Sequence, residues 1–139
     1  MPKNIIQKIG FKNTKPKALF DLYMSPKLHS LIAGSPVKIS SKAGAPFSAH
    51  KGYITGTSIY TVKDKIIAQA WRGADWAATE PDSFFTIVLE PKGKDTILHA
   101  IHLNVPDAHV EGIKKGWHGH YWNPWKQHLG GKKIKRPVM

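Results

Sequence analysis

Apolar and polar residues alternate near the start of the chain, and residues 4–11 have the two-residue period of a half-buried β-strand. The next apolar residues recur every three to four positions. This spacing predicts a helix with Thr14 as its cap and Pro16 in its first turn. Ser25-Pro26 interrupts the spacing, so we expect a second short helix that ends at Gly34-Ser35-Pro36.

The middle of the chain consists of short stretches rich in Thr, Ile and Tyr, separated by turn residues. Each stretch has the length of a strand, and the short connections favour antiparallel neighbours. The predicted strands are residues 37–39, 47–50, 53–62, 66–72, 83–90 and 96–105.

The last predicted strand carries apolar residues on both of its sides. One side holds Leu98, Ala100 and His102, and the other holds Ile97, His99, Ile101 and Leu103. Counting apolar residues favours the second set as the buried one, but the pattern of this strand alone leaves both orientations open.

Beyond residue 105 the spacing is again helical, and the apolar side consists of Val110, Ile113, Trp117, Tyr121 and Trp125. Gly112 and Gly116 weaken the first turns, so we expect the helix to begin near Ile113. Pro124 is expected to kink it. The order of elements predicts an α+β fold in which an antiparallel sheet packs against a long C-terminal helix ending near Leu129.

Composition narrows the class of protein. A chain of 139 residues with 41% hydrophobic residues suits a single domain, residues 1–139, of which residues 130–139 are expected to form a basic, flexible tail. Without cysteine there are no disulfides and no cysteine-based zinc site. No apolar run approaches the ~18 residues of a membrane span, and no apolar signal stretch follows Met1. We therefore expect a cytoplasmic protein.

The net charge is +12, from 21 Lys+Arg against 9 Asp+Glu, which attracts polyanions. The lysines are scattered, and the one dense basic run is Lys132-Lys133-Ile134-Lys135-Arg136. Because no reader motif accompanies them, we expect only weak, salt-sensitive binding to nucleic acid and no specific nucleic-acid partner.

Recognisable catalytic and metal-binding patterns are missing from the sequence. It contains no Gly-x-Ser-x-Gly elbow, no Gly-rich phosphate loop and no His-Glu-x-x-His motif. On a helix His118 and His120 point about 200° apart and cannot share a metal ion. We therefore predict no catalytic residue, no metal and no cofactor.

Aromatic residues crowd the last helix, and a curved sheet bridged by such side chains can leave an apolar pocket with few polar groups. We predict that a small hydrophobic molecule binds there, with the His102 ring and the Tyr121 hydroxyl orienting its polar end. A core in which the same side chains leave no space is the alternative. The predicted ligand-binding residues are Trp71, Phe85, Ile87, His102, Trp117, Tyr121 and Trp125.

Several motifs resemble those of a known family. They are His50-Lys51-Gly52-Tyr53-Ile54-Thr55-Gly56, Ile66-Ile67-Ala68-Gln69-Ala70-Trp71-Arg72 with Trp76, and Gly116-Trp117 followed by Tyr121-Trp122-Asn123-Pro124-Trp125-Lys126 and Leu129. In order and spacing, residues 5–129 resemble the domains of the activator of heat-shock-protein-90 ATPase homologues. The resemblance implies the START-like, helix-grip fold (SRPBCC) of the birch pollen allergen superfamily. It also implies that Leu98, Ala100 and His102 face the helix, contrary to the count above.

The resemblance implies three hypotheses for function. The wider superfamily binds lipids, sterols, polyketides and other hydrophobic molecules, which favours a lipid-like or aromatic ligand. The co-chaperone members use a separate N-terminal domain that these 139 residues do not contain. The resemblance to the chaperone activator is therefore one of fold. The second hypothesis is an interaction module acting on a chaperone or another acidic protein partner. Because some superfamily members are cyclases, the third is an enzyme of the cyclase or hydrolase kind.

Overall fold

The computed structural model describes residues 2–135, which form six strands and a set of helices. The strands are β1 (Lys3–Phe11), β2 (Pro46–Ala49), β3 (Ile54–Val62), β4 (Ile66–Gly73), β5 (Ser83–Lys92) and β6 (Asp95–Val105). The α-helices are α1 (Pro16–Met24), α2 (Pro26–Ala33), α3 (Val110–Trp117) and α4 (Asn123–Leu129). A 3-10 turn, η1 (Asp107–His109), precedes α3, and a π-helical segment, η2 (His118–Trp122), joins α3 to α4.

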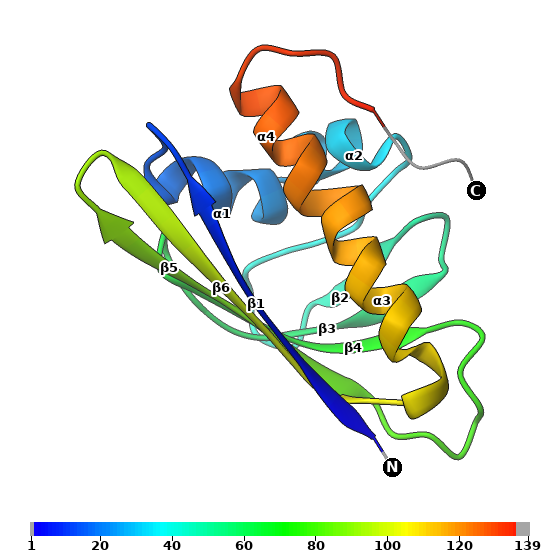
Figure 1. Ribbon diagram of the computed structural model, residues 1–139. Coiled ribbons are helices and arrows are strands. Elements are labelled where there is room, and N and C mark those ends of the chain that lie inside the picture. The colour runs from blue at the N-terminus through cyan, green and yellow to red at the C-terminus, as the bar shows by residue number, and fades with distance from the viewer. Residues whose placement is uncertain (1, 136–139) are drawn as a thin grey trace.

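The strands form one antiparallel sheet in the order β1-β6-β5-β4-β3-β2. The sheet curves around the continuous run of α3, η2 and α4, and α1 and α2 lie toward the α4 end (Figure 1). Side chains of the concave face and of these helices form the hydrophobic core. This arrangement confirms the predicted α+β, helix-grip fold and the end of the last helix at Leu129.

The orientation of β6 is the one implied by the family resemblance. The orientation favoured by counting apolar residues is wrong. Leu98, Ala100 and His102 are buried under the helices. The count was wrong because it assumed a polar outer face, whereas the outer face of this sheet is itself partly apolar. Ile6 on β1 is 74% exposed and Phe84 on β5 is 52% exposed, and both lie beside β6 residues of the outer face.

Other sequence predictions need local correction. Residues 37–39 form no strand, because Lys38 makes only an isolated bridge to Ser48 before the chain turns. Thr14 does not cap α1, since its hydroxyl donates to the carbonyl of Lys12 at 2.8 Å.

The last helix begins at Val110 and not near Ile113. Its first turn contains Glu111, whose charge suits the positive end of the helix dipole.

The disturbance expected at Pro124 takes the form of a π-helical turn directly before it. The N–H of Asn123 donates to the carbonyl of His118, five residues back.

Beyond α4 the predicted basic tail begins with ordered contacts, because Ile134 packs against the core and the Lys135 N–H donates to Gln127 Oε1 at 2.8 Å. Arg136 and residues 137–139 lie outside the described residues.

Gly56 provides a test of how closely β3 and β4 approach. It pairs with Trp71, and an added Cβ would overlap the carbonyl oxygen of Ala70. We expect Gly56→Ala to lower the free energy of unfolding by about 1–3 kcal/mol, as overpacking does, in urea denaturation. The matched control is Gly10→Ala in β1, where a Cβ meets nothing within 4 Å. An equal loss in both variants would contradict the close approach.

Candidate functional site

A cleft of about 350 Å³ opens beside α3. The ends of β3 and β4 form one wall, and η1, α3 and η2 form the other. The two walls are in contact through Trp71 and Trp117, whose ring centroids lie 5.9 Å apart. The lining residues are His50, Tyr53, Ile54, Trp71, Asp75, Ala108, His109, Gly112, Ile113, Gly116, Trp117, His120 and Tyr121.

Strand and helix periodicity place the aromatic residues of the cleft. Trp71 lies on the concave side of β4, as its burial shows. Trp117 and Tyr121 lie four residues apart and therefore project from nearly the same side of the helix. Gly112 and Gly116 also lie four apart, and without side chains they leave the helix wall of the cleft open.

The turn between β2 and β3 brings His50 to the cleft through unusual backbone geometry. His50 and Lys51 have φ angles of 53° and 58°, followed by Gly52 at 85°. Positive φ in two successive non-glycine residues costs of order 1–3 kcal/mol each, so neighbouring interactions must hold this turn in place. One of them is the contact of His50 Nε2 with the Tyr121 hydroxyl at 3.1 Å.

The carbonyl of Tyr23 determines the direction of each hydrogen bond among Tyr121, His29 and His50. The Tyr23 carbonyl can only accept, so His29 Nδ1 donates to it at 2.8 Å and His29 Nε2 is left as an acceptor. The Tyr121 hydroxyl therefore donates to His29 Nε2 at 2.9 Å. It then accepts from His50 Nε2, which fixes the proton of His50 on that nitrogen. We call this chain of four groups the histidine–tyrosine relay: His50, Tyr121, His29 and the Tyr23 carbonyl.

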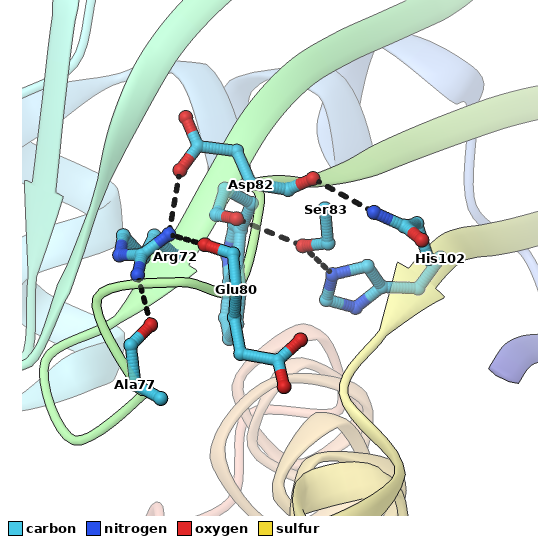
Figure 2. Close-up of polar contacts among 8 residues, drawn as sticks. Arg72, Ala77, Glu80, Asp82, Ser83 and His102 are labelled. Carbon is cyan, nitrogen blue, oxygen red and sulfur yellow. Dashed lines mark hydrogen bonds and ion pairs between the residues drawn. The ribbon is translucent and has the colours of Figure 1, made fainter. Parts of the chain in front are cut away.

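A second buried network surrounds His102. The Ser83 hydroxyl donates to the Trp71 carbonyl at 2.8 Å, so it accepts from His102 Nε2 at 2.7 Å (Figure 2). The other ring nitrogen, Nδ1, accepts from the indole N–H of Trp117 at 3.1 Å. Both nitrogens of His102 are thus occupied. The imidazole cannot take the proton of Ser83, so this pair is not an activated nucleophile.

Arg72 shapes the loop between β4 and β5 that carries Asp75 to the rim of the cleft. Its guanidinium donates to the carbonyls of Glu80 and Ala77 at 2.6 and 2.7 Å, and it contacts the Asp82 carboxylate at 3.2 Å (Figure 2). Asp75 itself accepts a 2.7 Å hydrogen bond from the Tyr53 hydroxyl.

Burial keeps the histidines of both networks neutral. It lowers the pKa of His29 to about 4 and, together with the nearby His120, that of His50 to about 4. Burial also lowers the pKa of His102 to about 3 and raises the pKa of the Tyr121 hydroxyl. At neutral pH the polar groups of the relay are therefore uncharged.

The seven residues predicted from the sequence divide into two groups in space. Trp71, Trp117 and Tyr121 line the cleft. The other four lie in the packed core below it, where Phe85 stacks on Trp117 with ring centroids 4.0 Å apart: Phe85, Ile87, His102 and Trp125. Sequence reasoning missed His50, Tyr53 and Asp75, and the signal that could have indicated the cleft is the Gly112–Gly116 spacing.

Within residues 2–135 no three His, Asp or Glu side chains are grouped as a metal site would require. Among the same residues no helix is long and apolar enough to cross a membrane.

His102 gives a pH test of its network. The folded state keeps this residue neutral, whereas the unfolded chain takes up a proton below about pH 6.5, so the stabilisation is complete above pH 6.5 and is lost as the pH falls toward 3. We expect His102→Gln to reduce the slope of unfolding free energy against pH, between pH 6.5 and 5, by up to about 1.4 kcal/mol per pH unit. Glutamine offers N–H donors and a carbonyl acceptor but does not titrate.

The control for this measurement is His118→Gln, at an exposed position. Denaturant unfolding at several pH values should give the wild-type slope for the control. A wild-type slope for His102→Gln as well would rule out the assigned protonation state.

Comparison with known proteins places the chain among relatives of this fold. An HSP90 activator from Plasmodium falciparum is 23% identical with a TM-score of 0.85, over 91% of this chain and 96% of that chain. A Mesorhizobium loti protein is 17% identical with a TM-score of 0.79, over 95% and 100%. A Chromobacterium violaceum protein is 22% identical with a TM-score of 0.70, over 91% and 96%.

The search of curated proteins found no match. Residues 13–130 match the family described as activator of Hsp90 ATPase homolog 1-like protein. That match covers most of the sequence, and the chain belongs to this family.

Proposed function

We propose that the protein binds a small, largely apolar molecule in the cleft beside α3. The observation that carries the proposal is the cleft itself, whose volume of about 350 Å³ falls in the range of small-molecule sites. Its lining includes the nearly buried aromatic side chains of Trp71, Trp117 and Tyr121, together with a few polar groups. The apolar body of a ligand would remove the remaining apolar surface of the lining from water.

Gly112 allows the cleft to be filled without disturbing the core. A Cβ at this position meets nothing within 4 Å, and the residue lies in the cleft wall. We expect Gly112→Leu to weaken binding of the neutral fluorescent probe N-phenyl-1-naphthylamine by about tenfold or more, or about 1.4 kcal/mol. The melting temperature should stay equal or rise, because glycine is a poor helix former.

The matched control is Lys115→Leu, which adds the same side chain to an exposed position of α3 outside the cleft. Its probe affinity should remain at the wild-type value. Failure of the wild type to bind any neutral apolar probe would contradict the proposed function.

The second candidate function is docking onto a protein partner, as the family name suggests for an Hsp90 chaperone. The observation that favours it is the exposed apolar strip on the outer face of the sheet: Ile6, Tyr60, Phe84 and Leu103. A net charge of +12 would assist approach to an acidic partner.

This second candidate is tested by the ATPase rate of a purified Hsp90 in the presence of the protein. We expect stimulation by the wild type and its loss in the double variant Ile6→Ser, Phe84→Ser, which removes two exposed apolar contacts. Leu129→Ser is the control, because Leu129 is exposed at the end of α4, outside the strip. A wild type without effect on the ATPase rate contradicts a role as an activator of this chaperone.

A further inference from the structure

The charge of the cleft is opposite to that of the protein. The chain has 21 Lys+Arg, yet none of the residues lining the cleft is a lysine or an arginine. One lining residue, Asp75, carries a carboxylate. Burial lowers the pKa values of His50 and His120, so these two side chains add no positive charge at neutral pH. An anionic ligand would therefore find no lysine or arginine in the lining to pair with, and it would meet the carboxylate of Asp75.

The hydroxyl protons of Tyr121 and Tyr53, both lining the cleft, are already used in hydrogen bonds. The Tyr121 hydroxyl is used in both directions, since it donates to His29 and accepts from His50. The Tyr53 hydroxyl gives its proton to Asp75, which leaves oxygen lone pairs on both residues. Among these groups the remaining capacity is that of acceptors.

His50 supplies a further acceptor beside the aromatic residues of the cleft. Its Nε2–H is committed to Tyr121, so its other ring nitrogen, Nδ1, is unprotonated and can only accept. The ring of His50 lies 5.7 Å from that of Tyr121, centroid to centroid, and the strained turn holds it there. A preorganised acceptor beside an apolar surface selects for a donor on the ligand.

We infer that the cleft takes an uncharged aromatic molecule with a hydroxyl donor, such as a phenol, whose ring lies against Trp71 and Trp117 and whose hydroxyl donates to His50 Nδ1. This inference rests on the proposed function and specifies its ligand class. It excludes fatty acids and other carboxylates as preferred ligands, despite the +12 charge of the chain.

Three ligands of nearly equal size separate the alternatives: 2-naphthol, 2-methoxynaphthalene and 2-naphthoate. Calorimetry or quenching of tryptophan fluorescence at pH 7 gives the three dissociation constants. We expect 2-naphthol to bind about three- to tenfold more tightly than 2-methoxynaphthalene, which lacks the donor, because one neutral hydrogen bond has about that value. The carboxylate should bind most weakly.

His50→Leu tests the assignment of the acceptor. It should reduce the preference for 2-naphthol over 2-methoxynaphthalene to about onefold, while Lys115→Leu, outside the cleft, retains the wild-type ratio. The ratio of the two dissociation constants is an internal control, since general damage to the cleft weakens the binding of both ligands equally. If the leucine variant does not fold, the wild-type series still decides the ligand class.

The outcomes separate this inference from the proposed function. Equal affinity for 2-naphthol and 2-methoxynaphthalene, or tightest binding of 2-naphthoate, overturns the ligand class and leaves the cleft as a binding site. A preference that persists in His50→Leu overturns the role of His50. Absence of binding by all three ligands overturns both.

Discussion

The hydroxyl group of Tyr121 joins three parts of the chain that are distant in sequence. It donates to His29 in α2 and accepts from His50 in the turn after β2, while its own ring packs against Trp117 of the last helix. A buried polar atom left without its partner costs about 1–3 kcal/mol, so all three parts must be placed together. The hydroxyl that links the last helix to α2 and to the turn after β2 therefore also sets the polar edge of the cleft.

Most of the fold could be predicted because strands and helices bury one side and their periods differ. The orientation of β6 could not be predicted from its own pattern, since both of its sides are apolar. The neighbouring elements determine which side of β6 is buried. One side meets the helices, and the other belongs to the outer face of the sheet, on which Ile6 and Phe84 remain exposed. That information lies in the neighbouring strands and helices and not in the strand itself.

The site was predictable only where periodicity positions the side chain. Trp117 and Tyr121 follow from helical spacing. His50 depends on a turn with two positive φ angles and on a partner 71 residues away, and neither leaves a mark in the local sequence. For His102 the family resemblance implied the inward orientation. Its hydrogen bonds to Ser83 and Trp117, which occupy both ring nitrogens, could not be predicted from the sequence.

The π-helical segment divides the last helix into two halves with separate neighbours. A π turn inserts one extra residue, which rotates the side chains that follow by about 100° relative to an uninterrupted α-helix. Before the segment, Gly112, Ile113 and Gly116 border the cleft; after it, Trp125 is buried beside Phe11. Substitutions in the first half can remodel what the cleft accepts without changing the contacts of the second half. The ligand preference of the cleft can thus be altered separately from the packing that holds the second half of the helix in place.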